Sequence, residues 1–387
     1  MNTILYIWYD ELRSLLRDKG VMIFCLFVPL AYPLLYAYVY TNEVVREVPS
    51  VVVDQCKSQK SREFIRKVDG TPDVKIIARC ASMEEAKGHL QRHEAYGIYK
   101  IPDTFDLDIA QGDQTHIGLY CDMSSMLYYK ALLLAATDVS LDMNRDIKIT
   151  HLSPTTIRDE EIKRTPVEYE HINLYNPQSG FASFLIPPVL MLIIQQTLLL
   201  SIGMRMGDTR EENMGCTIPF DRHYKNAAQI VVGKSAVYLM IYFVMAVYMF
   251  TFVHQSFSLV QIGHYSSLIA FIVPFILACI FFAMTLSALI YRREDCILIF
   301  VFLSVPLLFL SGISWPGSAI PAFWKYVSWL FPSTFGMNGY VRIMTMGAGI
   351  GDIHTEYMAL WAQAAFYFGT SCLMYWRNIR RMVALKG

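Results

Sequence analysis

Six apolar segments, none of which contains Asp, Glu, Lys or Arg, constrain the fold of this chain more than any other feature. They span residues 21–40, 181–204, 235–253, 267–290, 297–314 and 357–376. A hydrocarbon core about 30 Å thick takes roughly 20 helical residues to cross, and a helix satisfies its own backbone hydrogen bonds there. Because 54% of the 387 residues are hydrophobic and only 17% are charged, the bilayer must serve as part of the solvent. We therefore predict a polytopic α-helical membrane protein with six transmembrane helices.

Cationic residues between these segments indicate how the chain is oriented, because loops kept in the cytoplasm carry an excess of Lys and Arg. Alternate connecting segments hold Arg13, Arg17, Lys19, Arg205, Arg210, Arg222, Lys225, Lys234, Arg292, Arg293, Arg377, Arg380, Arg381 and Lys386. The short opposite segments, 254–266 and 315–356, hold only Lys325 and Arg342. Both termini, including the tail at 377–387, are therefore predicted to be cytoplasmic.

A polar stretch at 41–179 separates the first apolar segment from the five-helix region at 181–376, and the charge rule places this stretch outside. Its pattern predicts strands at 49–55, 73–80, 96–102 and 115–122, and helices at 58–70, 82–95 and 124–144. Ser82 and Glu85 occupy the positions of a helix N-terminal capping box. We predict an external α/β domain with a small mixed sheet, inserted after the first helix.

The N-terminal stretch, residues 1–19, is amphipathic. Leu5, Trp8, Leu12 and Leu15 or Leu16 follow one helical face. This pattern is typical of a helix on the inner membrane surface, or of a lead-in helix with no partner. The first apolar segment is not predicted to be a cleaved signal peptide, because no clear small-x-small cleavage site follows it.

Composition and motifs argue against catalysis, nucleic-acid binding and a metal site. The formal net charge is +0, whereas binding to nucleic acid needs a basic surface. The string A-x-x-x-x-G-K-S at 228–235 lacks one glycine of a phosphate-binding loop and runs directly into an apolar span, so this chain is not expected to bind ATP. Of the cysteines, Cys56, Cys80 and Cys121 permit one external disulfide, although buried free thiols are the simpler interpretation, and no Cys/His set has metal spacing.

Three glutamines stand inside the apolar segments: Gln195 and Gln196 in the second and Gln363 in the sixth. Polar groups in hydrocarbon are expensive and usually face other helices or a cavity. They are candidates for a transport pathway, with helix-to-helix hydrogen bonding as the alternative.

Several strings, taken together and in order, resemble the permeases of ABC-2 type transporters, in the subgroup with a large external domain after the first span. They are VVVDQCKSQKSREFI at 51–65, SMEEAKGHL at 82–90, YGIYKIPDTFDLDIAQG at 96–112, YNPQSGFASFLIPPVL at 175–190 and PLLFLSGISWPGSAIPAFWKYVSWLFPST at 306–334. The resemblance runs nearly end to end. After the second span the family pattern is kept at Arg210, Glu211, Gly215, Thr217 and Pro219, while intervening Glu and Leu positions are missing or shortened.

This resemblance implies the membrane subunit of an ABC exporter in the inner membrane. Two permease subunits, identical or paired with a sister chain, would be driven by separate ATPase subunits that hold ATP and Mg, and no cofactor is expected on this chain. Membrane lipid surrounds such a protein, and efflux permeases also engage a periplasmic adaptor and an outer-membrane channel. The alternative is a membrane receptor or scaffold that does not transport and whose external domain binds a partner.

ATP-driven movement must reach the helices through rigid cytoplasmic surfaces, which makes the N-terminal helix and the loop at 208–225 the main coupling candidates. The individual candidates are Glu11, Arg210, Glu211, Gly215, Thr217, Pro219, Arg292 and Arg293. For Arg292 and Arg293 a role in setting membrane topology is the alternative. At the other side, the aromatic-rich segment 315–351 is predicted to form short interfacial helices, with Phe323, Trp324 and Trp329 as outer gate candidates.

Overall fold

The computed structural model describes residues 3–150, 174–177, 179–219 and 223–386. The chain divides into two compact units. The first, named the helical unit, comprises Met1–Glu43 and Asn173–Gly387, and the second, the α/β unit, comprises Val44–Ile172.

The α/β unit contains a four-stranded sheet in the order β2-β1-β3-β4. Its strands are β1 (Val48–Asp54), β2 (Val74–Cys80), β3 (Gly97–Ile101) and β4 (Gly118–Cys121). β1 runs parallel to β2 and β3, and β4 is antiparallel to β3, which confirms the predicted mixed sheet. The predicted helices are present as α4 (Gln59–Asp69), α5 (Met83–Gln91) and α7 (Met126–Thr150). The short helix α6 (Phe105–Gln111) was not predicted.

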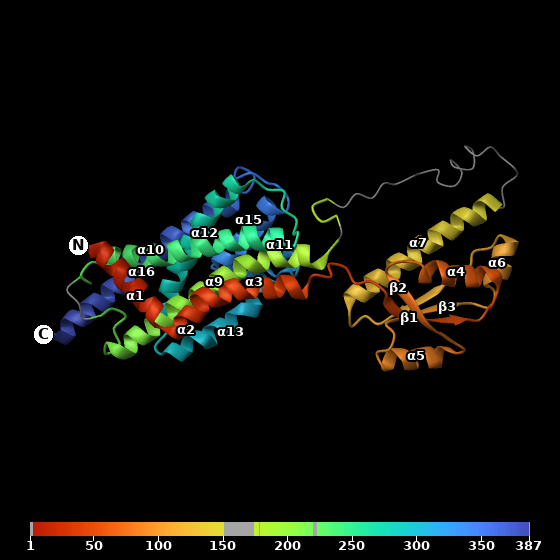
Figure 1. The fold of residues 1–387 in the computed structure, drawn as a ribbon, viewed down its shortest axis with the longest axis horizontal. Helices are drawn as coiled ribbons and strands as arrows, with labels where there is room; N and C mark the ends of the chain where they lie inside the picture. Colours follow the sequence, from red (N-terminus) through yellow and green to blue (C-terminus); the bar gives the residue numbers. More distant parts are fainter. Residues whose placement is uncertain (1–2, 151–173, 178, 220–222, 387) are drawn as a thin grey trace. The chain divides into compact units, whose positions relative to one another are not determined.

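Both faces of this sheet are covered by helices (Figure 1). Val48, Val52 and Tyr99 point to one face, where they pack with residues of α4, α6 and α7. Val51 and Ile98, one residue out of phase, point to the other face and pack with α5. Because side chains alternate along a strand, the continuous apolar run of β1 supplies both cores.

The helical unit is built from long helices joined by short turns (Figure 1). The N-terminal helix α1 covers Thr3–Arg17, and the first predicted span is α2 (Lys19–Met22), η1 (Ile23–Phe27) and α3 (Val28–Val39). The central elements are α9 (Phe181–Glu212), α10 (Ala227–Val247), η2 (Tyr248–Val253), α11 (His254–Ser256), α12 (Tyr265–Leu286) and η3 (Ser287–Leu289). The last elements are α13 (Arg293–Leu310), η4 (Gly317–Ala319), α14 (Ala322–Ser328), α15 (Pro332–Met344) and α16 (His354–Lys386).

Among the described residues, four helical stretches are long and apolar enough to cross a membrane: Lys19–Val39, Phe181–Glu212, Ala227–Ser256 and Tyr265–Leu289. The protein is therefore a helical membrane protein. Helices α13 and α16 lie where the fifth and sixth spans are expected. Helix α13 carries three charged residues in its first turn, and α16 carries polar residues such as Gln363 within its apolar stretch.

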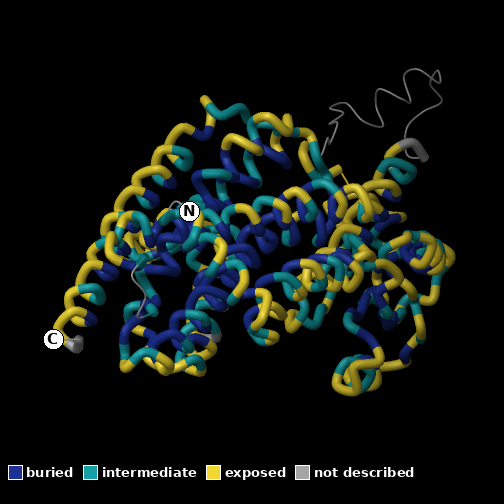
Figure 2. The backbone as a smooth tube through the Cα atoms, turned by 60° about the vertical axis from the view of Figure 1, so that its left-hand side comes forward, coloured by how far each residue is buried: buried dark blue, intermediate teal, exposed yellow. Residues whose placement is uncertain are grey.

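Helix α9 lies at the centre of the helical unit and packs against α3, α12, α13 and α15. It is apolar on all sides and buried along most of its length, as expected for a helix surrounded by others. Figure 2 shows these buried residues in the interior of the helical unit, whereas the C-terminal end of the chain is mostly exposed.

The start of α9 is tied to the end of the first span. The backbone carbonyl of Glu43 accepts a hydrogen bond from the amide of Phe181 at 2.8 Å. The Glu43 carboxylate accepts two more, from the amide of Ser183 at 3.1 Å and from its hydroxyl at 2.7 Å. These bonds satisfy amides that the first turn of a helix leaves unpaired.

Helix α1 is amphipathic as expected, and most of the predicted apolar face packs: Leu15 is buried, and Trp8 and Leu12 are partly buried against the core. Ile7, Glu11 and Leu15 are buried against α10, whereas Leu5 and Leu16 are exposed. The alternative for residues 1–19, a lead-in helix that packs against nothing, is therefore wrong, because α1 packs against α10. The apolar side chains left outside, Leu5, Tyr9 and Leu16, form a second stripe that suits a membrane surface.

Helix α15 differs from its prediction, whereas the cysteines agree with the simpler interpretation of free thiols. Helix α15, within the segment predicted to be interfacial, is largely buried among other helices. Its glycines allow this, since a Cβ at Gly336 or Gly339 would meet the ring of Phe275 or Phe271. All eight cysteines are free, so the external disulfide that the sequence permits is not formed.

Candidate functional site

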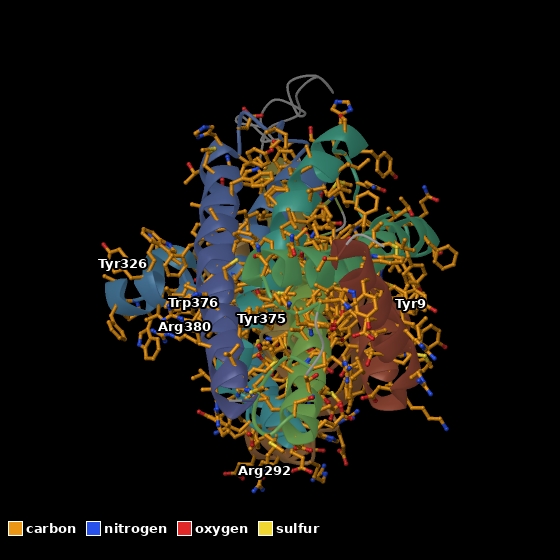
Figure 3. All side chains as sticks on the ribbon, turned by 90° about the vertical axis from the view of Figure 1, so that its left-hand side faces the viewer. Tyr9, Arg292, Tyr326, Tyr375, Trp376 and Arg380 are labelled. Carbon is orange, nitrogen blue, oxygen red and sulfur yellow. The ribbon has the colours of Figure 1, made fainter. Side chains whose placement is uncertain are left out.

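A charged cleft forms where three segments distant in sequence meet at one end of the helical unit, the end that faces the viewer in Figure 3. Asp18 caps the start of α2, Asp208 lies near the end of α9, and Arg293 begins α13. Arg293 Nη1 lies 2.9 Å from Asp18 Oδ2 and 3.0 Å from Asp208 Oδ2. The cleft measures about 380 Å³ and is lined by Ser14, Arg17, Asp18, Arg205, Asp208, Glu211, Glu212 and Arg293.

Asp18 is ionised in this arrangement. Burial alone would raise the pKa of its carboxyl group, but hydrogen bonds from Arg293 and from the amide of Val21 outweigh that effect and hold the pKa well below its ordinary value. Arg293 also donates from Nη2 to Asp18 Oδ1 at 2.9 Å, so the contact is bidentate. Bidentate guanidinium–carboxylate pairs fix geometry as well as charge.

Two glycines make the close approach of these segments possible. A Cβ at Gly20 would collide with the guanidinium of Arg293. A Cβ at Gly207 would lie 2.7 Å from the backbone nitrogen of Arg293 and 2.9 Å from the carbonyl carbon of Arg292. Backbone atoms cannot yield as a side chain does, so Gly207 sets the distance between α9 and α13.

Changing Gly207 to Ala is therefore expected to destabilise the helical unit by about 1–3 kcal/mol, as overpacking does. The matched control is Gly369→Ala, because a Cβ at Gly369 on α16 would meet nothing within 4 Å. That control is expected to be neutral or to stabilise by up to about 1 kcal/mol, since alanine favours helices. Thermal unfolding of the two variants in detergent measures the difference, and equal unfolding temperatures would contradict the packing argument.

The turn between α12 and α13 is held by two adjacent side chains of α9. Arg210 is buried and donates hydrogen bonds to the carbonyls of Ala288, at 3.1 Å, and Ile290. Glu211 accepts one from the amide of Arg293 at 3.3 Å. We call this arrangement the α9 clamp: the Arg210 guanidinium donates to two carbonyls of the turn, and the Glu211 carboxylate accepts from an amide of the same turn. Movement of that turn must therefore be shared with the end of α9.

The segment after α9 turns back against α16. Gly215 has a φ of +81°, a left-handed conformation that glycine adopts without strain. The amide of Thr217, which is fully buried, donates to Asn378 Oδ1 at 3.4 Å, and Pro219 is half-buried. Residues 220–222 of the predicted coupling loop lie outside the described residues.

Glu11 and Lys234 form a buried ion pair between α1 and α10. Glu11 Oε2 lies 2.9 Å from Lys234 Nζ, and the two side chains are only 4% and 2% exposed. Tyr238 donates to Glu11 Oε1 at 3.0 Å. Lys234 stands at the start of an apolar span, and its ammonium group lies inside the protein.

The contact between α1 and α10 also accounts for the glycine in the A-x-x-x-x-G-K-S string at 228–235. A Cβ at Gly233 would lie 2.9 Å from the side chain of Ile7 and 3.2 Å from the carbonyl oxygen of Ile4, so glycine is needed where α10 meets α1. Burial alone would raise the pKa of Glu11, but the charges of Lys234 and Arg205 hold that pKa below its ordinary value. Gly233 and Lys234 thus both serve helix packing.

The three glutamines do not line one site. Gln195 Oε1 accepts a hydrogen bond from the amide of Ser333 at 2.6 Å, and Gln363 donates to the carbonyl of Trp329 at 2.7 Å. The two side chains, from α9 and α16, therefore hold the junction between α14 and α15. Gln196 is 4% exposed, and among the described residues neither of its amide atoms has a hydrogen-bond partner.

The outer gate candidates all belong to α14 and its end. Phe323, Trp324 and Trp329 are 69%, 50% and 46% exposed. Phe323 packs edge-to-face with Trp324, and Trp329 with Tyr326. Within one copy of the chain these rings face outward.

Asp18 and Asp208 lie in the predicted coupling segments, residues 1–19 and 208–225, but neither was named as an individual candidate. Asp18 precedes Lys19 and Gly20 at the start of the first span, where an N-cap aspartate is a recognisable signal. Asp208 gives no local signal, because only the fold brings it to Arg293. Arg292, by contrast, was a candidate whose side chain is exposed and whose amide donates to Asp295 at 2.9 Å, while Figure 3 shows it at the edge of this end of the unit.

Comparison with known proteins gives one family. A family model described as ABC-2 family transporter protein matches residues 19–373. A comparison with curated proteins found no match. The family match begins at the first span, after α1, and continues through the α/β unit and the later helices into α16.

Proposed function

The chain belongs to the ABC-2 family of transporter proteins, and from that premise we propose that it is the permease subunit of an exporter whose ATP is hydrolysed by a separate subunit. Two permease subunits, two copies of this chain or this chain and a sister chain, enclose the pathway. The chain itself holds no nucleotide and catalyses no reaction, and ATP and Mg are bound by the partner. This division is supported by Gly233 and Lys234, which are occupied by contacts with α1.

Six helices cross the inner membrane in this proposal, with both termini in the cytoplasm and the α/β unit outside. Contacts between connecting segments support it. Segments expected inside meet one another: Asp18 and Asp208 with Arg293, Glu11 with Lys234, and Thr217 with Asn378. Segments expected outside also meet: Glu43 with Ser183, His254 with Tyr340, and Ile262 with Met344.

The α9 clamp is the observation that carries the coupling proposal. It joins the turn at 288–293 to the central helix α9, which itself contacts α3, α12, α13 and α15. A rigid element that touches most of the bundle can convert a push on one turn into movement of several helices. Arg210 is buried and cannot contact a partner itself, so it transmits the movement rather than receives it.

The receiving surface is an exposed patch beside the clamp, which we name the docking patch: Met214, Leu289, Tyr291 and Arg292. Tyr291 is 70% exposed, and its ring stacks on the Arg210 guanidinium at 5.0 Å from the ring centroid. Exposed apolar side chains with a charged rim are typical of a protein interface. We propose that the ATPase subunit binds here.

Changing Tyr291 to Ala is expected to weaken binding of the ATPase subunit about tenfold, because an exposed aromatic anchor at an interface contributes roughly 1–2 kcal/mol. The unfolding temperature should stay at the wild-type value. The measurement is copurification of the ATPase subunit and its ATP hydrolysis rate with the permease in lipid vesicles.

Tyr326→Ala is the matched control, since Tyr326 on α14 is 63% exposed and belongs to a segment expected on the opposite side. A loss of binding in both variants, or in neither, would argue against the docking patch. A stable complex that lacks any nucleotide-binding subunit would instead favour the receptor or scaffold. The cargo, a periplasmic adaptor and an outer-membrane channel are expected to meet the outer side, where the α/β unit is placed by this proposal.

A further inference from the structure

Three metal-binding side chains gather at one corner of the α/β unit. Strand β2 ends at Cys80, the turn at 81–82 follows, and α5 carries Glu85 and His89 one helical turn apart. Residues four apart on a helix lie on the same face. One ligand atom from each of Cys80, Glu85 and His89 lies within 4.8 Å of the others.

The turn is fixed by hydrogen bonds that leave these ligand atoms accessible to an ion. Ser82 Oγ accepts from the amide of Glu85 at 3.2 Å, and Glu85 Oε2 accepts from the amide of Ala81 at 2.8 Å, the reciprocal bonds of a capping box. Glu85 therefore keeps Oε1 for another partner. Cys80 is buried, with 6% of its surface exposed, so its sulfur is held in place.

His89 is oriented by a carboxylate. Its Nδ1 lies 2.6 Å from Glu94 Oε2, and Arg92 Nε donates to Glu94 Oε1 at 2.9 Å. A carboxylate that fixes one nitrogen of an imidazole while the other faces the ion is the usual outer partner of a metal-binding histidine. Here Nε2 is the nitrogen left for the ion.

We propose that Cys80, Glu85 and His89 bind a transition-metal ion of the zinc type. A thiolate, an imidazole and a carboxylate together select zinc and its neighbours rather than calcium or magnesium, which prefer oxygen ligands alone. Three protein ligands leave a fourth position for water or for a group of another molecule. The site is independent of the proposed transport role and of the cytoplasmic contacts described above.

Sequence spacing did not reveal this site because the ligands form C-x4-E-x3-H, with a carboxylate between the cysteine and the histidine. A search restricted to Cys/His sets passes over it. The parallel sheet and the capped helix bring the end of β2 and the first turns of α5 together. This placement, and not the sequence spacing, brings the three ligand atoms close to one another.

The test is titration of the purified full-length chain in detergent with Co²⁺, whose thiolate complexes absorb in the near ultraviolet. We expect one equivalent to bind with a thiolate-to-cobalt charge-transfer band, and Zn²⁺ to abolish the band by displacement. Cys80→Ser should remove the band, and His89→Gln or Glu85→Gln should weaken binding by about tenfold or more. Glu85→Gln keeps an oxygen for the amide of Ala81, so its helix cap is retained.

Cys56→Ser and His93→Asn are the matched controls, because both residues lie in the same unit and outside the cluster. Both should bind as the wild type does, and circular dichroism should show that every variant keeps its secondary structure. No thiolate band in the wild type, or a band that survives Cys80→Ser, would overturn the proposal. So would equal weakening by the control variants.

Discussion

Changing Lys234 to Met is expected to cost about 3–5 kcal/mol of unfolding free energy, a large fraction of the total stability of a typical domain. The change leaves the Glu11 carboxylate buried without its cation, at a place where the two side chains are 4% and 2% exposed. Water cannot replace the lost partner there. Thermal unfolding of the chain in detergent, followed by intrinsic fluorescence, should show a clear fall in Tm.

The double variant Glu11→Leu with Lys234→Met separates charge from packing. Removing both charges leaves nothing unpaired, so most of the lost stability should return, as it does when other buried ion pairs are replaced by apolar side chains. Lys225→Met, which removes an exposed cation nearby, should change stability by less than about 0.5 kcal/mol. If Lys234→Met unfolds at the wild-type temperature, the ion pair does not hold α1 to α10.

The pH dependence of this effect has a definite sign. The pKa of Glu11 is lowered in the folded chain from an ordinary value of 4.5. A carboxyl group whose pKa falls on folding contributes stability that is complete above the unfolded pKa and is lost as the pH drops through the folded pKa. In Lys234→Met burial is left to raise the pKa of Glu11, so the destabilisation should begin to shrink above pH 4.5, as the buried carboxyl group takes up a proton, and should be smallest at acidic pH.

Changing Arg293 to Met is expected to reduce permease-dependent ATP hydrolysis by about tenfold, because the variant loses roughly 2 kcal/mol of charged hydrogen bonds that align α2, α9 and α13. Asp18 and Asp208 would then lose the cation that bridges them. Arg293→Lys should retain part of the activity, because the positive charge is kept. It should not retain all of it, because an ammonium group cannot form the bidentate contact with Asp18. The measurement uses vesicles that contain the permease and the ATPase subunit that copurifies with it.

Arg13→Met serves as the control for this variant, because Arg13 is a cation on α1 outside the cleft. It should leave ATP hydrolysis unchanged. Binding of the ATPase subunit should survive in Arg293→Met, because the docking patch is intact. Wild-type hydrolysis in that variant would show that the Arg293 bridge serves topology alone, the role that the sequence offered as the alternative.

Local patterns predicted most of the secondary structure. The strands β1 to β3 and the helices α4, α5 and α7 begin and end within a few residues of their predicted positions, because their signals are alternation, capping and turn residues close together in sequence. The signal for each apolar span also lies within one continuous stretch of sequence. Helix α13 is the marginal case, because its first turn carries charges that bind the ends of other helices.

The contacts around Glu11, Lys234 and Arg293 could not be predicted in this way. Glu11 and Lys234 are far apart in sequence, and the predicted apolar stripe of α1 did not include Ile7 and Glu11, which are buried against α10. Helical periodicity identifies two chemically distinct faces but does not say which one meets protein and which one meets lipid. Arg293 was recognised as a cation near the membrane, whereas its two carboxylate partners come from separate segments that only the folded chain assembles.

The bonds between Glu43, Phe181 and Ser183 have a consequence for how such chains evolve. The chain leaves the helical unit and re-enters it at two points already joined by hydrogen bonds, so the bundle does not depend on what lies between them. Insertions are tolerated where the ends of the inserted piece are close together. The α/β unit can therefore be exchanged or changed in sequence while the contacts within the helical unit stay fixed.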